Sequence, residues 1–238
     1  MFSLFSCIFT GKSNFRGKVA GVFTSKASFS SKKIFMPNQI EEITLDGGWL
    51  CLDFTNTVSN RREAKFGEYL NTWEDYVVWV RRLGVLSEAE FGLWQQMPPG
   101  DMNEVRALRE AIFELFNHWA QTGAIHPAHL DTLNSFLHEV YMYTCIKVTE
   151  NGLERGIFKK TYPEKPLWLI ALSAESLLLG DRLSRVKACD NCGWLFLDTS
   201  KNGTRRWCNM DTCGSQAKAK AYYHRKKEED SRNIRLPE

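Results

Sequence analysis

The sequence has no uninterrupted apolar run of about 18 residues, the length that a membrane-spanning helix requires. It also has no glycine-rich phosphate loop and no evident pairing of a nucleophile with a general base. Its five histidines do not recur at metal-binding spacing on a helix. After residue 36 there are no internal repeats and no low-complexity tracts. These absences argue against a membrane-spanning protein, a repeat protein and an enzyme.

Acidic residues are missing from the first 35 positions, which carry six Lys and Arg and are rich in Ser and Phe. That composition resembles an organellar transit peptide. The alternative that we favour is a natural start at Met36, because the patterned sequence begins soon after it. We therefore expect residues 1–35 to be a poorly ordered leader or a mis-assigned start.

Four of the seven cysteines fall in one short segment as two close pairs. Cys189 and Cys192 have two residues between them, Cys208 and Cys213 have four, and fifteen residues separate the pairs. Four thiolates at this spacing can form a closed tetrahedral shell around Zn²⁺. The odd cysteine total and the short spacings favour a metal in a reducing compartment over disulfides. The sequence therefore predicts one structural zinc ion and a cytoplasmic protein.

The residues between the cysteine pairs predict a small β-hairpin. Residues 194–197 are bulky and apolar, and residues 204–207 read as a returning strand. The dipeptide Asn202-Gly203 between them favours a tight turn. Gly193, which follows a cysteine, suits a knuckle that needs a residue without a Cβ atom.

A basic helix is expected directly after the last cysteine. Gly214 suits a second knuckle, and Ser215 is predicted to cap a helix from about Gln216 to Lys227. A knuckle, a hairpin and a helix that carries the last ligand would form a treble-clef-like zinc finger over residues 183–230.

Charge is divided unevenly along the chain. Residues 182–227 carry a net charge of +8, residues 36–181 carry −9, and the whole chain carries only +3. A basic, metal-bound end on an acidic body concentrates attraction for phosphate at that end. The charge pattern therefore favours a nucleic-acid partner for the cysteine-rich segment.

The run from Cys189 to Cys213, followed by a basic helix, resembles the CGNR zinc finger. The segment GGWLCLDFTNTVSNRR, residues 47–62, resembles the opening of the ABATE domain that precedes such fingers. The resemblance implies an ABATE-like domain over residues 36–182 and a stress-induced bacterial transcription regulator. One departure is clear, since the tetrad that names the finger ends here in Ser215 and Gln216 instead of Asn and Arg.

The leading functional hypothesis is a DNA-binding transcription regulator. The residues expected to contact nucleic acid are Arg205, Arg206, Gln216, Lys218, Lys220, Arg225, Lys226 and Lys227. Basic side chains on phosphate fix position, and Gln216 or Lys220 could reach a base edge. The alternatives are a zinc-stapled module that binds protein or RNA and, more remotely, an enzyme with a site in the N-terminal domain.

Polar residues of the ABATE-like motif form the second candidate site. Leu50, Phe54 and Val58 repeat every four positions, which favours a helix and places Asp53 and Asn56 near one another. Together with Arg61 and its neighbour Arg62, they could line a pocket for a small-molecule effector. The alternative is a buried carboxylate and amide that hold neighbouring loops. The N-terminal domain could instead form a homodimer.

The rest of the chain predicts an α+β fold, mostly helical, with one small β-hairpin. Residues 39–46 read as a short strand. Thr72, Ser87 and Asp101 are expected to begin helices, the last of them an amphipathic helix to Gln121. A further helix should follow Pro127, then a hairpin with its turn at Asn151-Gly152, then an apolar helix over residues 166–180.

Overall fold

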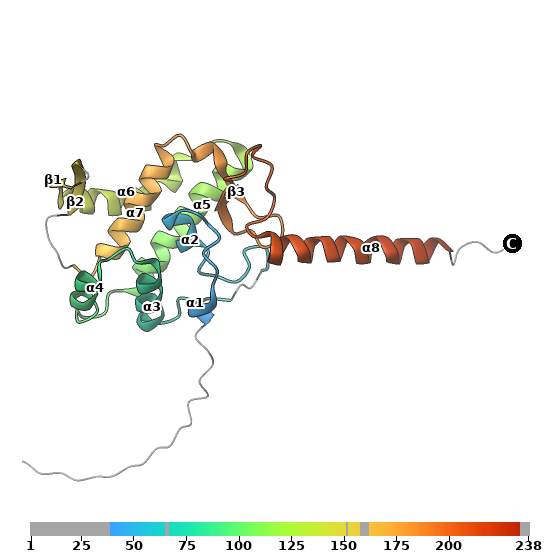
Figure 1. The fold of residues 1–238 in the computed structure, drawn as a ribbon, viewed down its shortest axis with the longest axis horizontal. Coiled ribbons are helices and arrows are strands. Elements are labelled where there is room, and N and C mark those ends of the chain that lie inside the picture. The colour runs from blue at the N-terminus through green and yellow to red at the C-terminus, as the bar shows by residue number, and fades with distance from the viewer. Residues whose placement is uncertain (1–38, 65–66, 151, 158–161, 234–238) are drawn as a thin grey trace, which may run out of the picture. The chain divides into compact units, whose positions relative to one another are not determined.

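A computed structural model describes residues 39–64, 67–150, 152–157 and 162–233, with side chains as far as Asp230 (Figure 1). The expected leader, residues 1–35, lies outside the described residues. The elements follow in the order α1 (Gln39–Glu42), α2 (Leu50–Thr55), α3 (Trp73–Leu83), α4 (Glu88–Trp94), α5 (Met102–Thr122), η1 (Pro127–His129), α6 (Asp131–Tyr141), β1 (Thr144–Thr149), β2 (Gly152–Ile157), α7 (Lys165–Leu178), η2 (Leu183–Arg185), β3 (Val186–Ala188), β4 (Leu195–Leu197), η3 (Met210–Gly214) and α8 (Ser215–Asn233). The predicted α+β class, mostly helical before the cysteine-rich segment, is confirmed.

Three helices begin at the predicted caps because their first turns satisfy their own backbone N–H groups. Thr72 and Ser87 each accept a hydrogen bond from the amide three residues later, and the acid at that position accepts one from the amide of the cap residue. Asp101 accepts a bond from the amide of Asn103 at 2.7 Å. Caps of this kind contribute roughly 1 kcal/mol each and fix where the chain enters α3, α4 and α5.

Helix α5 lies at the centre of the core and contacts α2, α6, α7 and β3 (Figure 1). Its predicted apolar stripe is buried over Val105, Leu108, Ile112, Leu115 and Phe116. Leu195 and Phe196 of β4 and the zinc-ligand candidate Cys189 belong to the same buried cluster. The helical part and the cysteine-rich part are therefore packed around one shared core.

The predicted strand at residues 39–46 is wrong, because the chain forms the short helix α1 there. Ile40 and Ile43 lie three residues apart and are both buried, a spacing that a helical turn places on one face. Arg82 of α3 donates hydrogen bonds to the carbonyl oxygens of both residues. The apolar pair and the arginine explain why a helical turn is more stable than a strand.

Strand pairing agrees with one prediction and contradicts another. β1 and β2 form the expected antiparallel hairpin, and Asn151 of its turn lies outside the described residues. Between the cysteine pairs, however, β4 pairs with β3, which precedes the first cysteine, and residues 204–207 form no strand. The turn dipeptide at residues 202–203 therefore belongs to a loop and not to a hairpin.

Helix α7 packs against α2 and α6, as expected for an apolar core helix. Within the described ranges, no helix combines the length and the apolar character that crossing a membrane would require.

Candidate metal centre and basic surface

The four paired cysteines lie together, as their spacing predicts. All four Sγ atoms lie within 4.8 Å of one another, and the Sγ of Cys208 is 3.7 Å from those of Cys192 and Cys213. A tetrahedral shell with Zn–S bonds of about 2.3 Å has sulfur–sulfur edges of about 3.8 Å. The cluster thus has the dimensions of a zinc shell, and its four side chains are buried. The residues fit one structural zinc ion held by four thiolates, without a position for substrate.

Close packing of Cys189, Cys192 and Cys208 separates the pKa values of these three thiols. The Cys189 sulfur accepts hydrogen bonds from Cys192 and Cys208, which lowers the pKa of Cys189 far below its usual range. Donation of those bonds raises the pKa of Cys192 and Cys208 far above theirs. Ionising Cys192 and Cys208 as well as Cys189 would therefore require a cation bound between the sulfur atoms. A zinc ion would supply that charge, and its binding would release protons.

The first knuckle is held by the motif at residues 47–62. The amide of Arg61 donates to the carbonyl oxygen of Cys192 at 2.8 Å, and the guanidinium of Arg62 donates to that of Cys189 at 3.0 Å. Gly193 adopts φ of +75°, and a Cβ atom there would lie 2.9 Å from the Cβ of Arg61. Arg62 therefore supports the metal ligands from outside the shell, a role that its place in the motif did not reveal.

The second knuckle corrects the predicted cap. Asn209, not Ser215, accepts the hydrogen bonds from the first free amides, those of Asp211 and Thr212. Ser215 donates its hydroxyl proton to the carbonyl oxygen of Met210 and lies inside a continuous run from η3 into α8. An Asn directly after a ligand cysteine is a cap signal that sequence reasoning missed. The last ligand, Cys213, is thereby placed at the base of α8.

A single carboxylate organises the loop that was expected to be a strand. Asp198 accepts hydrogen bonds from the amides of Ser200 and Arg205. It also forms an ion pair with Lys187, with 2.8 Å between the carboxylate oxygen and Nζ. These donors hold the pKa of Asp198 well below its usual range although the side chain is buried. The backbone that would otherwise pair with a strand is satisfied by this side chain instead.

Asp53 and Asn56 are buried, the Arg61 side chain is only 4 % exposed, and none of the three lines the groove beside α8 or either of the other two pockets described. Asp53 accepts a hydrogen bond from the amide of Gly47. Arg61 pairs with Glu110, donates to the carbonyl oxygen of Thr55 and lies over the ring of Phe113. The structure thus favours the alternative interpretation, in which these groups hold neighbouring segments together.

Asn56 joins the motif to the finger. Its amide nitrogen donates to the carbonyl oxygen of Leu195 at 2.9 Å, and its amide oxygen accepts from the Leu195 N–H at 3.0 Å. Trp194 donates to the carbonyl oxygen of Val58, and Leu197 donates to that of Gly47. The motif therefore satisfies the backbone of β4 on the side away from β3.

Replacing Asn56 with alanine should lower the free energy of unfolding by about 2–4 kcal/mol, because two buried backbone groups of Leu195 would lose their partners. Urea unfolding followed by circular dichroism would measure the loss. An Asn60→Ala variant is the control, since the Asn60 side chain bonds at the exposed surface. A loss below 1 kcal/mol for Asn56→Ala would contradict the bridging role.

Asp53 predicts a pH dependence of stability. Burial raises its pKa from 3.8 to about 6. The folded chain then binds this proton more tightly than the unfolded chain, so the stability present below pH 4 is lost as the pH rises through 6, by about 2–3 kcal/mol in total. An Asp53→Asn variant keeps the acceptor for Gly47 and should be the more stable protein at pH 8. Thermal unfolding between pH 5 and 8 would measure this, and a variant that is less stable at every pH would show that the carboxylate itself is required.

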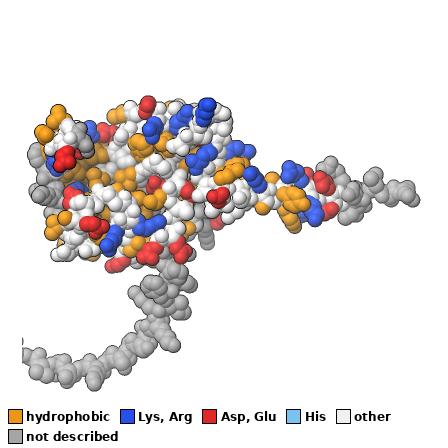
Figure 2. Space-filling model, in the orientation of Figure 1, with side chains coloured by type: hydrophobic (Ala, Val, Ile, Leu, Met, Phe, Trp, Pro, Cys, Tyr) orange, Lys and Arg blue, Asp and Glu red, His pale blue; other side chains and the backbone are white. Residues whose placement is uncertain are grey.

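Some of the residues predicted to contact nucleic acid have partners within the protein, and the others are exposed on α8. The Arg205 guanidinium donates to the carbonyl oxygens of Trp207 and Cys208 and lies over Phe196, so it supports the knuckle. Arg206 is 67 % exposed at its side chain and pairs with Asp190. Gln216 accepts a hydrogen bond from Asn191. The remaining candidates, Lys218, Lys220, Arg225, Lys226 and Lys227, are exposed on α8 (Figure 2).

A groove of about 500 Å³ lies between the first knuckle and α8. Its lining residues are Asp190, Asn191, Arg206, Trp207, Ala217, Lys218, Lys220, Ala221 and His224. Ala217, Ala221 and His224 follow helical spacing, so one face of α8 forms one wall. The groove was not predicted, because it depends on how α8 leaves the metal centre.

Two family models match the chain. Residues 48–181, more than half of the chain, match ABATE, described as "Putative stress-induced transcription regulator". Residues 185–226 match the CGNR zinc finger. The matches and their order agree with the resemblance seen in the sequence. A search of curated proteins found no match.

Proposed function

Because the chain belongs to the ABATE family and carries a CGNR zinc finger, we propose that it is a transcription regulator that binds duplex DNA through its basic C-terminal surface. The zinc centre serves a structural role in this proposal, since it orients α8 and the first knuckle. The N-terminal domain would sense a small-molecule effector or form a homodimer, and no catalytic role is proposed. The cytoplasm would keep the thiolates reduced.

The observation that carries the proposal is the groove beside α8. Arg206, Lys218 and Lys220 lie along it, and its one carboxylate, Asp190, is already paired with Arg206. The cavity is therefore lined mainly by donors and by small side chains. A phosphate backbone satisfies donors of this kind, whereas an acidic or apolar partner surface would leave part of them unpaired.

The shape and charge of α8 support the same partner. The helix has 19 residues and is therefore about 28 Å long, and from Lys218 to Asp230 its side chains are exposed. The major groove of DNA accommodates a helix of this width. Its cations cluster between Lys218 and Lys227, and three acids, Glu228, Glu229 and Asp230, then separate this cluster from Arg232. Phosphate contacts would thus be concentrated in about the first four turns, the part of α8 nearer the metal centre.

Gln216 retains capacity for a base edge. Its amide oxygen accepts a hydrogen bond from Asn191, which leaves the amide nitrogen available as a donor. An amide donor in the major groove can bond to acceptor atoms on a base, and adenine is the usual partner of Gln. Gln216 stands where the family tetrad has Arg. It would therefore replace a contact to phosphate with a more selective contact to a base.

A second candidate function is an interaction module for RNA or protein. Tyr222 and Tyr223 on α8 are 62 % and 66 % exposed, and exposed aromatic rings can stack on unpaired bases or pack against a protein. Such rings would not be needed for binding to the duplex backbone alone.

Competition binding separates these functions. The zinc-loaded full chain would be titrated against a labelled mixed-sequence duplex, with unlabelled duplex, an RNA hairpin and a protein extract as competitors. The proposal expects unlabelled duplex to displace the label at the lowest concentration. If RNA or protein displaced the label at a much lower concentration than unlabelled duplex, the second candidate function would be favoured.

A further inference from the structure

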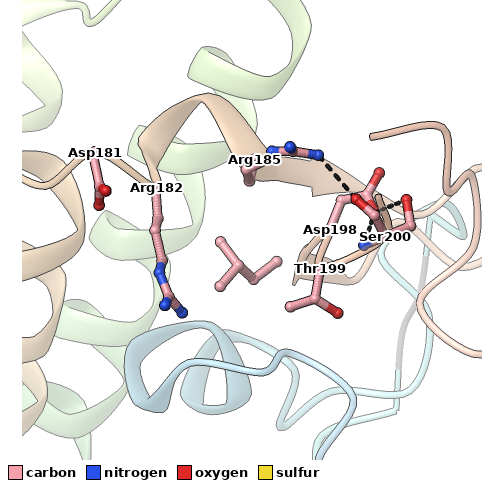
Figure 3. A pocket seen from close by; sticks show the side chains of 7 residues that line it. Asp181, Arg182, Arg185, Asp198, Thr199 and Ser200 are labelled. Atoms are coloured by element: carbon pink, nitrogen blue, oxygen red, sulfur yellow. Dashed lines mark hydrogen bonds between the residues drawn. The ribbon is translucent and has the colours of Figure 1, made fainter. Parts of the chain in front are cut away.

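A second pocket lies where the connection after α7 meets the loop after β4, and its volume is about 330 Å³ (Figure 3). It is lined by Asp181, Arg182, Arg185, Leu197, Asp198, Thr199 and Ser200. None of these residues is a zinc-ligand candidate or lines the groove beside α8. We propose that this pocket binds a small oxyanion, a molecule that presents a phosphate or carboxylate group.

Arg182 supplies the main attraction. Its guanidinium lies 5.8 Å from the centre of the Trp49 ring, which restrains it by a cation–π contact. Among the described residues, no carboxylate or carbonyl oxygen forms a hydrogen bond with this group. All of its N–H donors therefore remain available to a ligand, and a planar guanidinium binds carboxylate and phosphate with two bonds at once.

Two further residues with donor groups, Arg185 and Thr199, line the same pocket (Figure 3). Arg185 donates from Nη1 to the carbonyl oxygen of Ser200 at 3.1 Å, which fixes the side chain, and its other nitrogens bond to no oxygen in the part of the chain that the structure describes. Thr199 is exposed and belongs to the same lining, and rotation about its χ1 would let the hydroxyl bond to a ligand. Buried Leu197 provides an apolar surface for the carbon atoms of an organic ligand.

The acids of the pocket oppose an anion only weakly. Asp198 is paired with Lys187, and its remaining oxygen accepts two bonds from Ser200. Asp181 is exposed and lies beyond Arg182 in Figure 3, so water screens its charge. The pocket therefore presents two arginines against one exposed carboxylate.

The pocket joins the two parts of the chain that the core also joins. Arg182 and Trp49, with which it makes a cation–π contact, belong to the helical side, and Thr199 belongs to the loop after β4. A bound anion would therefore link the helical part to the finger. The inference concerns binding alone and holds whether or not α8 contacts DNA.

Isothermal titration of the zinc-loaded full chain with inorganic phosphate and, separately, with citrate tests the proposal. Sodium chloride at matched ionic strength is the reference. We expect saturable one-to-one binding of at least one anion, and the stronger probe identifies the phosphate or the carboxylate class. Arg182→Ala should weaken that binding by about tenfold or more. Thr199→Val should weaken it less, and Lys201→Ala should not change it, because Lys201 lies beside the loop but not in the pocket.

Two results would overturn the inference. One is no saturable binding of either anion at millimolar concentrations. The other is equal binding by the wild type and by Arg182→Ala, with zinc content and circular dichroism unchanged. Loss of duplex binding in Arg182→Ala without any binding of small anions would assign this arginine to nucleic acid, and it would equally reject the pocket as an anion site.

Discussion

Cys208→Ala is expected to lose its zinc and to lower the stability of the whole folded chain, not only that of the finger. Cys208 lies between two other ligand sulfurs at 3.7 Å, so its loss opens the shell. Structural zinc contributes roughly 10–16 kcal/mol, which equals or exceeds the total stability of a typical domain, about 5–15 kcal/mol. Because β4 and Cys189 share the core with α5, unfolding of the finger would expose that core.

Elemental analysis of the purified variant would measure zinc, and circular dichroism would follow thermal unfolding. Cys145→Ala is the matched control, since Cys145 lies on the β1–β2 hairpin away from the cluster. We expect the control to retain one zinc per chain and to melt like the wild type. A Cys208→Ala protein that keeps one zinc would refute the ligand assignment. Two separate melting steps, the later one at the wild-type temperature, would refute the shared core.

Reversing the charge of Lys218 and Lys220 is expected to weaken duplex binding about 100-fold at 0.1 M salt. Both residues are exposed and line the groove beside α8. If five phosphates are neutralised by Arg206, Lys218, Lys220, Arg225 and Lys227, the log–log slope of affinity against salt is about −4.5. Removing two of these contacts should reduce the slope to about −2.7, and each lost contact costs about tenfold in affinity at this salt concentration.

Fluorescence anisotropy of a labelled duplex over a range of salt concentrations would give both the loss of affinity and the log–log slope. The matched control reverses Lys201 and Lys226, which changes the net charge by the same amount. Lys201 lies outside the groove, and helical spacing of about 100° per residue turns Lys226 away from the wall formed by Ala217 and Ala221. Equal losses in both double variants would mean that only net charge matters and that the groove is not the binding surface.

The features that sequence predicted are those with local causes. Thr72, Ser87 and Asp101 cap helices because each side chain bonds to amides two or three residues away. The cysteine pairs were equally readable, because ligand spacing is a local property. The stripe on α5 followed from a periodicity that lies within a single helix.

The features that sequence missed depend on distant partners. Asn56 bonds to Leu195, which lies 139 residues later, so no local pattern could separate a bridge from a pocket. The strand partner of β4 precedes the first cysteine, whereas the Asn202-Gly203 signal pointed to the residues after it. The anion pocket combines Arg182 with Thr199 across the start of the finger, and each residue alone is unremarkable in the sequence.

The hydrogen bonds that β4 makes to residues 47 and 56, and that Trp194 beside it makes to residue 58, affect whether the finger can be moved to another protein. A finger fragment that lacks the preceding domain would expose the edge of β4 together with Leu195 and Phe196, which are fully buried in the intact chain. Exposed apolar edges of this kind promote aggregation. Fusing this finger alone to another protein should therefore fail unless the segment that receives β4 is transplanted with it.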